Sequence, residues 1–331
     1  MSDQGRHMGL STFERDLVVA LQRAPRAPFA TLAAELGADE RTVRRAMRRL
    51  QEDGVLTYSA TVSYEKTHGW LAAQLEIGCR PGMSNAVAQA LADRSETRYV
   101  AVTTGDANIV AELVTPAPGA LHDLVADELE GLNGVRWVRT QVAMRLLLSA
   151  ADWDPDGRRT VARQQAIDGV RKYAGAELDE SDTAIVGALD DDVRMSAARI
   201  AQRVGLHETT VQRRLRRLTE SGTIHVRADV PPAELGFPVE ARFTLQVSPN
   251  GLDAALRRLA AEPALRALYV VTGPSSVLGY SVHPSMAALE DLIDGPFAQI
   301  EGLAGCDIRV VLRAYKRNGT RVRAAGKSPP S

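Results

Sequence analysis

The chain has 331 residues, of which 45% are hydrophobic and 24% are charged. This length and composition predict a soluble globular protein with two or more domains. The formal net charge is −1, from 40 basic and 41 acidic residues. A generic polycation is therefore excluded, and any affinity for nucleic acid must come from local patches.

Cysteine usage and hydropathy exclude further classes of protein. Cys79 and Cys306 are the only cysteines and lie far apart, so they predict neither a disulfide framework nor a thiolate metal site. Residues 1–11 are polar and lack the apolar run of a signal peptide. The most apolar stretch, residues 146–151, is too short to span a bilayer. We expect a cytoplasmic protein with no membrane partner, no metal and no cofactor.

The first predicted unit is helical. Apolar residues recur at helical spacing over residues 10–21 and again over residues 29–36. Gly37 then makes a turn into a third helix. Residues 55–64 have an extended pattern, as expected for a small β-wing. These elements together predict a winged helix-turn-helix over residues 10–64.

The third helix carries the strongest functional signal in this unit. Val43, Met47 and Leu50 fall on one apolar face. Asp39 is suited to cap the first turn, and Gly54 to end the last one. The remaining surface carries the arginines Arg41, Arg44, Arg45, Arg48 and Arg49. A basic helix after a short helix and a glycine turn is typical of the recognition element of a helix-turn-helix.

The next unit, residues 69–150, alternates between strand and helix patterns. We predict a strand, a helix, two strands joined by a tight turn, a second helix and a last strand. The expected bounds are 71–79, 83–92, 98–103, 107–114, 121–132 and 135–148. The order β-α-β-β-α-β predicts a ferredoxin-like module, whose helices cover one sheet face and leave the other for a partner.

The second half of the chain repeats the first at a separation of 168 residues. The positions in register include Gly37 with Gly205, Val43 with Val211, Arg45 with Arg213, and Gly54 with Gly222. The repeat predicts a second winged helix-turn-helix at residues 177–231 and a second ferredoxin-like module at 236–315. The helices of the former are expected at 178–189, 196–204 and 206–222, and its wing at 223–230. The strands of the latter are expected at 239–247, 267–272, 276–282 and 306–312, and its helices at 252–261 and 286–300.

Two segments lie outside the repeat. Residues 151–176 contain turn formers and a helical pattern over 158–173, which we interpret as a flexible tether with a connecting helix. Residues 316–331 are basic and predict a disordered tail. Because each sheet module has one face that needs cover, we expect the two modules to pack together within one chain.

With these units in place, each half resembles a whole subunit of the leucine-responsive/asparagine-synthesis regulator (Lrp/AsnC) family of bacterial transcription factors. The segments that carry the resemblance are Glu14-Arg15-Asp16, Thr42-Val43-Arg44-Arg45, Thr104-Gly105-Asp106, Leu178-Asp179-Glu180-Ser181-Asp182 and Thr210-Val211-Gln212-Arg213. The resemblance implies an α+β fold with two tandem copies of a winged helix-turn-helix followed by a ferredoxin-like ligand-sensing module. It also implies subunits that pair through their sheet faces, assemble into dimers or higher oligomers, and bind small effectors, commonly amino acids, near the strand-turn-strand.

The leading hypothesis is a sequence-specific regulator that binds double-stranded DNA, because arginine both neutralises phosphate and pairs with guanine. In the first half we expect Glu40, Arg41, Arg44 and Arg45 at base edges, with Arg48 or Arg49 at phosphate. In the second half we expect Thr209, Gln212 and Arg213 at base edges, with Arg216 and Arg217 as anchors. Arg214 has two open alternatives, a stem buried along the helix or a pair with an acid. Since the two helices differ, we expect an operator with two unlike half-sites.

The predicted effector site follows from the resemblance. Its residues are Thr103, Thr104, Gly105, Asp106, Asn108, Gly273, Ser275 and Ser276. The family often has a second acid where this chain has Asn108, and the second turn has no acid at all. A carboxylate is the natural partner of an α-amino group. Asp106 is therefore either the ligand of such a group or an ordinary turn residue.

Two alternative functions stay open. Sirohaem decarboxylases that resemble this family share the two-module architecture, but the His-Asn-Tyr stretch of those enzymes is replaced here by Arg98-Tyr99-Val100-Ala101. The six histidines form no spaced cluster, which argues against an enzyme. The other alternative is a sensor that has lost DNA binding. The arginines of both recognition helices argue against it.

Overall fold

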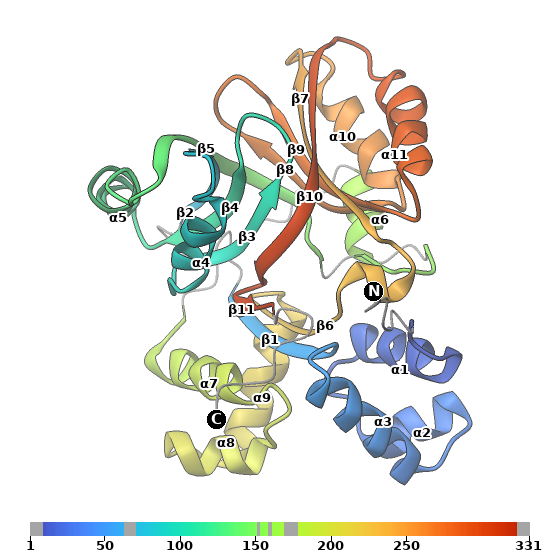
Figure 1. Cartoon of the computed structure of the whole chain (residues 1–331). Helices are drawn as coiled ribbons and strands as arrows, with labels where there is room; N and C mark the ends of the chain where they lie inside the picture. The colour runs from blue at the N-terminus through green and yellow to red at the C-terminus, as the bar shows by residue number, and fades with distance from the viewer. Residues whose placement is uncertain (1–8, 63–70, 151–152, 158–160, 169–177, 323–331) are drawn as a thin grey trace, which may run out of the picture.

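The computed structural model describes residues 9–62, 71–150, 153–157, 161–168 and 178–322. A closed β-barrel with helices on its outer side occupies one end of the molecule (Figure 1). Two three-helix units lie beneath the barrel, joined by a two-stranded ribbon. Within the described chain, no helix has both the length and the apolar character needed to cross a membrane.

The three-helix units have the same design in both halves. The first contains α1 (Thr12–Arg23), α2 (Phe29–Leu36) and α3 (Glu40–Glu52), and the second contains α7 (Glu180–Asp191), α8 (Ala197–Val204) and α9 (Glu208–Glu220). Ser11 and Glu14 form a capping box at the start of α1. Gly37 and Gly205 end α2 and α8 with φ of 61° and 70°, a conformation that favours glycine. The apolar faces meet in a separate core for each unit.

The ribbon that joins these units differs from the prediction. Residues 57–62 and 224–229 are extended, as expected for wings, and form β1 (Thr57–Val62) and β6 (Ile224–Asp229). However, β1 pairs antiparallel with β6 of the other half, with Ser59 opposite Arg227 at the centre. The expectation of a separate wing in each half is therefore wrong. Each strand satisfies its backbone hydrogen bonds across the two halves, so the ribbon ties the helical units together.

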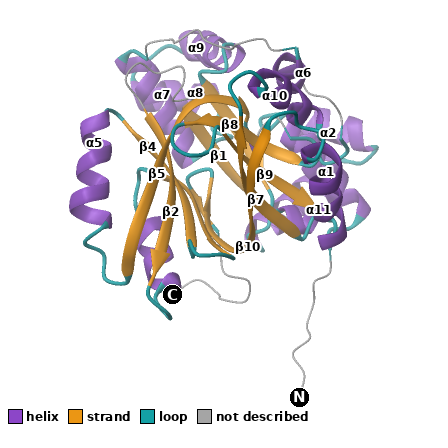
Figure 2. Ribbon diagram, turned by 90° about the horizontal axis from the view of Figure 1, so that it is seen from above, coloured by secondary structure: helices purple, strands orange, loops and turns teal. Residues whose placement is uncertain are grey.

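Both sheet modules have the predicted order β-α-β-β-α-β. The first contains β2 (Leu71–Cys79), α4 (Ser84–Ala92), β3 (Thr97–Thr103), β4 (Ile109–Thr115), α5 (Pro118–Asp123) with a π-turn (Leu124–Leu129), and β5 (Val135–Leu148). The second contains β7 (Val239–Val247), α10 (Leu252–Ala261), β8 (Leu265–Val271), β9 (Val277–His283), α11 (Met286–Leu292) with a π-turn (Ile293–Phe297), and β10 (Leu303–Arg317). The helices cover the outer face of each sheet (Figure 2). A 3₁₀ turn (Pro232–Leu235) precedes β7.

The two sheets close into a barrel because two long strands exchange partners. The first part of β5 pairs with β2, and the rest pairs with β8. In the same way β10 pairs first with β7 and then with β3. The pair Ala143↔Val271 recurs at the corresponding positions of the repeat as Val311↔Thr103. The two modules therefore pack together within one chain about a pseudo-two-fold axis, as the sequence predicted.

The same exchange corrects the predicted end of the chain. The last strand was expected to end at residue 312, but β10 runs to Arg317 and is followed by β11 (Thr320–Arg321). Lys316 Nζ donates to the carbonyl of Arg94 at 2.5 Å, and the Tyr315 hydroxyl donates to Asn85 at 2.7 Å. Residues 316–322 therefore continue the ordered chain at the end of β10 and do not belong to a disordered tail. Residues 323–331 lie outside the described chain.

The described part of the linker is packed against the second module. Trp153 is buried, donates to the carbonyl of Pro263 at 3.2 Å, and stacks edge-on against Phe237. Arg163 in α6 (Val161–Ile167) donates to three carbonyls between residues 260 and 265. For residues 153–157 and 161–168 the expectation of a flexible tether is wrong, because these anchors fix them to the module. The other linker residues lie outside the described chain.

The inner face of the barrel carries a network of buried polar groups. Glu76 of β2 pairs with Arg242 of β7 at 2.7 Å, and Arg139 of β5 lies 2.8 Å from the same carboxylate. Burial opposes ionisation of Glu76, but the charge and hydrogen bond of Arg242 outweigh it and lower the Glu76 pKa. A carboxylate in one module thus holds a guanidinium of the other in an interior where an unpaired charge would be costly.

The Glu76–Arg242 pair gives a test of module docking. Glu76→Gln leaves the Arg242 guanidinium buried without its countercharge, and we expect a loss of about 3–5 kcal/mol in unfolding free energy. Urea denaturation at neutral pH measures this loss. The double variant Glu76→Gln/Arg242→Met removes both charges and should recover most of it. A single variant as stable as the original protein would contradict this account of the interface.

A second carboxyl in the barrel gives a test in which the substitution is expected to stabilise the protein. Glu112 of β4 accepts hydrogen bonds from Gln74 at 2.7 Å and Tyr269 at 3.0 Å, and its burial raises its pKa. A raised folded-state pKa stabilises the fold below the pKa of the unfolded chain, and this contribution is lost as pH rises. Glu112→Gln should therefore raise the melting temperature at pH 8, with a gain that shrinks toward pH 5. A gain independent of pH would show that Glu112 titrates normally.

Candidate functional site

The recognition helices α3 and α9 present all of their predicted contact residues to solvent. The exposed members are Glu40, Arg41, Arg44, Arg45, Arg48, Arg49, Thr209, Gln212, Arg213, Arg216 and Arg217. The Arg44 guanidinium lies 3.0 Å from Glu40 and stacks 3.8 Å over the ring of Phe29. Gln212 donates to Glu208 at 3.0 Å. These contacts orient Arg44 and Gln212 along their helices while leaving them accessible.

One arginine of each recognition helix braces its own three-helix unit. Arg49 of α3 pairs with Glu14 of α1, and Arg217 of α9 pairs with Asp182 of α7. The Arg49 and Arg217 side chains remain 63% and 55% exposed, while both acids are buried. The two pairs occupy corresponding positions of the repeat. We infer that these predicted phosphate anchors also fix the angle between the first and third helices.

The structure decides between the two alternatives for Arg214. Its guanidinium lies 2.7 Å from Asp179 and 2.8 Å from Asp182, so Arg214 pairs with acids of α7. The hydrogen bonds that Arg214 donates to these acids raise the Arg214 pKa. An arginine held in this way stabilises the second helical unit.

The two recognition helices start with different caps. The Asp39 carboxylate accepts hydrogen bonds from the Thr42 amide at 2.8 Å and the Thr42 hydroxyl at 2.9 Å, which lower the Asp39 pKa. His207 at the corresponding position makes no capping hydrogen bond. The first turn of α3 is therefore fixed by its cap, whereas the first turn of α9 lacks this support.

A reciprocal arginine contact, which the sequence analysis missed, holds the two helical units together. Arg26 donates to the carbonyl of Met195 at 2.8 Å. Arg194 donates to the carbonyls of Pro25 at 2.5 Å and Ala27 at 2.7 Å. Burial and the nearby charge of Arg194 lower the Arg26 pKa. Arg26 and Arg194 are corresponding positions of the repeat, and this correspondence was the signal that could have revealed the contact. With the β1–β6 ribbon, it fixes the spacing of α3 and α9.

The first predicted effector turn forms an ion pair and hydrogen bonds with residues of β10. Asp106 pairs with Arg309 at 2.7 Å, and the hydrogen bond from Arg309 lowers the Asp106 pKa. Thr104 exchanges two hydrogen bonds with Val310. Gly105 has a φ of 98°, and a Cβ there would lie 2.7 Å from Arg309. The turn is thus shaped around the guanidinium of Arg309, which comes from the second module.

The remaining predicted effector residues divide between structural contacts and a cavity. The Thr103 hydroxyl donates to the carbonyl of Ala107, and Asn108 accepts from the Cys79 amide at 2.8 Å. In the second turn Gly273 has a φ of 96°, and the Ser276 hydroxyl bonds the backbone of Val247. Ser275 lines a cavity of about 380 Å³ between the two sheets. The other lining residues are Glu76, Arg139, Gln141, Thr244, Gln246, Pro274, Gly305, Cys306, Asp307 and Arg309.

Protein-family models for a helix-turn-helix domain and for a ligand binding domain each match both halves of the chain. The models match residues 10–57 as a winged helix-turn-helix DNA-binding domain and 178–219 as an AsnC-type helix-turn-helix domain. The Lrp/AsnC ligand binding domain matches residues 72–151 and again 240–320. The chain belongs to the Lrp/AsnC family. It holds two complete sets of the family's domains in tandem.

Single-unit relatives match about half of this Lrp/AsnC protein. The HTH-type transcriptional regulator Ptr1 of Methanocaldococcus jannaschii is 29% identical over 140 residues, which cover 42% of this chain and 95% of Ptr1. The leucine-responsive regulatory protein of Rhizobium meliloti is 33% identical over 145 residues, which cover 42% of this chain and 92% of that protein. Each relative therefore corresponds to one of the two repeats.

A solved structure matches the tandem arrangement as a whole. The siroheme decarboxylase NirDL superposes with a TM-score of 0.62 over 95% of both chains, at 15% sequence identity. At this identity the match shows that the two proteins share a fold.

The unequal caps lead to a stability prediction. His207→Asp supplies α9 with the carboxylate that α3 has in Asp39, and we expect a gain of about 1 kcal/mol in unfolding free energy. Chemical denaturation followed by circular dichroism measures the change. His207→Asn should give a similar gain, while His207→Leu should not. Equal stability of all three variants would show that the start of α9 does not limit the fold.

Proposed function

We propose that this protein is a sequence-specific DNA-binding transcriptional regulator in which one chain supplies the two recognition helices that a family homodimer would supply. The observation that carries the proposal is the pair of arginine-bearing helices, α3 and α9, held at one spacing by the β1–β6 ribbon and the Arg26–Arg194 contact. Guanidinium groups on an exposed helix face suit both phosphate neutralisation and base readout. Family membership supports the same function.

The two helices support an asymmetric operator. Arg44 of α3 and Gln212 of α9 occupy the corresponding position of the two recognition helices, and both are exposed. Arginine favours guanine and glutamine favours adenine, and each good pair discriminates by about 1–3 kcal/mol. The operator should therefore have two unlike half-sites about one helical turn, or a small multiple of it, apart.

The cavity beside the second turn supports regulation by a small polar effector such as an amino acid. Its volume of about 380 Å³ lies in the usual range of ligand pockets, about 300–1,000 Å³. Glu76 and Asp307 offer carboxylates, and Arg139 and Arg309 offer guanidiniums, so the lining matches both ends of a zwitterion. Self-association into dimers or higher oligomers completes the proposal, as in the family.

Selection from random DNA with variants of each helix tests the proposal. We expect Arg44→Ala to relax the preference in one half-site and Gln212→Ala to relax it in the other, each by about 1–3 kcal/mol. Arg257→Ala, an exposed arginine of α10 on the barrel, is the matched control and should leave the consensus unchanged. No enrichment of any sequence would favour the alternative in which the protein is a sensor without DNA binding.

The full-length match with NirDL favours a second candidate, a sirohaem-decarboxylase-like enzyme. Against it stand the one-half sequence matches with regulators and the stretch Arg98-Tyr99-Val100-Ala101 in place of the His-Asn-Tyr stretch of those enzymes. Absorbance of the purified protein after incubation with sirohaem separates the two functions. A stable complex in which the bound sirohaem loses carboxyl groups would support the enzyme and contradict the regulator. An unchanged spectrum, with specific DNA selection, would reject the enzyme.

A further inference from the structure

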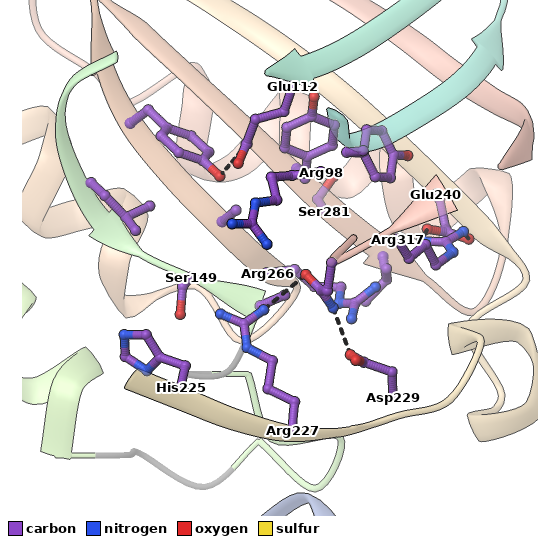
Figure 3. A pocket seen from close by; sticks show the side chains of 18 of the residues that line it. Arg98, Glu112, Ser149, His225, Arg227, Asp229, Glu240, Arg266, Ser281 and Arg317 are labelled. Atoms are coloured by element: carbon purple, nitrogen blue, oxygen red, sulfur yellow. Dashed lines mark hydrogen bonds and ion pairs between the residues drawn. The ribbon is translucent and has the colours of Figure 1, made fainter. Parts of the chain in front are cut away.

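A second cavity, of about 140 Å³, lies between the β1–β6 ribbon and the adjacent mouth of the barrel. Arg227 and Asp229 reach it from β6, Arg98 and Arg266 from the barrel, and Arg317 from the end of β10 (Figure 3). It is distinct from the cavity beside Ser275, since the two share none of their lining residues. The site is where the DNA-binding half of the molecule meets the ligand-binding half.

Charge in this cavity is biased toward the positive. Four guanidiniums line it, and Arg317 is matched by Glu240 through two bonds of 2.8 and 2.5 Å. Asp229 accepts from Ser59 at 2.7 Å and from Asn318 at 2.6 Å. The third acid, Glu112, has a raised pKa because it is buried.

Three of the arginines have a buried donor without a hydrogen-bond partner, namely the Nε atoms of Arg227, Arg266 and Arg317. The charge of Arg317 is already matched by Glu240, which leaves Arg227 and Arg266. Burial is the largest cause that lowers the Arg266 pKa, and the nearby positive charge of Arg317 lowers it further. A buried donor on a charged group is costly when unpaired, so an anion placed between these two side chains would relieve both.

One side of the wall is apolar and aromatic. Tyr99 and Tyr280 meet edge to face with ring centroids 5.2 Å apart, and Val114, Leu146 and Tyr269 complete this side. A cavity of about 150 Å³ is large enough for benzene. The ligand that fits such a space has a compact apolar body and a negative group.

We propose that this cavity binds a small organic carboxylate with an aromatic or branched apolar body, and that the bound carboxylate ties the β1–β6 ribbon to the barrel through Arg227 and Arg266. In the first half of the chain, Ser59 stands where the second half has Arg227, while Arg98 stands where it has Arg266. Arg227 therefore has no counterpart across the pseudo-two-fold axis, so its pairing with Arg266 occurs once in the chain. The stoichiometry is one carboxylate per chain.

Calorimetric titration of the full chain with benzoate tests binding without DNA. Benzoate should bind with a stoichiometry of one, whereas benzyl alcohol, which lacks the charge, and inorganic phosphate, which lacks the apolar body, should not. Arg266→Gln and Arg227→Gln should each weaken benzoate binding by about tenfold or more, the value of a charge-assisted hydrogen bond. Arg257→Gln and Ser275→Val, both outside this cavity, should leave it unchanged.

Hydrogen exchange tests the tie between ribbon and barrel. Saturating benzoate should slow exchange of the β1–β6 amides by about tenfold if it adds one such bond across the junction. Arg227 is only partly buried, so Arg227→Gln serves if Arg266→Gln fails to fold. Absence of benzoate binding, or binding that both glutamine variants retain, would overturn the site. Binding with unchanged ribbon exchange would overturn the tie. Neither outcome depends on whether the protein binds DNA.

Discussion

The exchange of strand partners by β5 and β10 is the constraint on which the rest of the structure depends. Each strand begins in its own sheet and ends in the other, so neither module can complete its hydrogen bonds alone. The exchange brings the two inner sheet faces together, and these faces carry Glu76 and Arg242 as a complementary pair. In the folded chain each half therefore depends on the other for its complete sheet.

Closing the barrel also fixes where the two helix-turn-helix units lie. The barrel strands β2 and β7 follow the ribbon strands β1 and β6 in the chain, so barrel closure brings the ribbon strands side by side. The ribbon and the Arg26–Arg194 contact then hold α3 and α9 at one distance. In a homodimer both recognition helices must be identical. Here α3 carries Arg44 and α9 carries Gln212 at the corresponding position of the same arrangement.

The sequence predicted the modules well because the repeat is strong and the patterns are local. The bounds expected for residues 71–79, 135–148 and 239–247 agree with β2, β5 and β7. The errors lie where a partner distant in sequence decides the structure. The basic composition after residue 315 suggested a tail, yet Lys316 and Arg317 complete a strand beside β3 and β7.

The candidate sites show the same division. Exposed arginines on α3 and α9 follow from helical period, whereas the braces that hold Arg49 and Arg217 depend on the packing of the first helix. Asp106 was a candidate ligand from its turn, but its partner Arg309 comes from the other half of the chain. The cavity at the ribbon could not be predicted, since its walls combine residues from nine strands of both repeats.

Native mass spectrometry of a complex with a short duplex that carries both half-sites tests the central claim most directly. If one chain provides both recognition helices, the ratio of chains to duplexes in the complex is one to one. Both half-sites of each duplex are then protected from nuclease cleavage. Two chains for each duplex, each protecting a single half-site, would contradict the account.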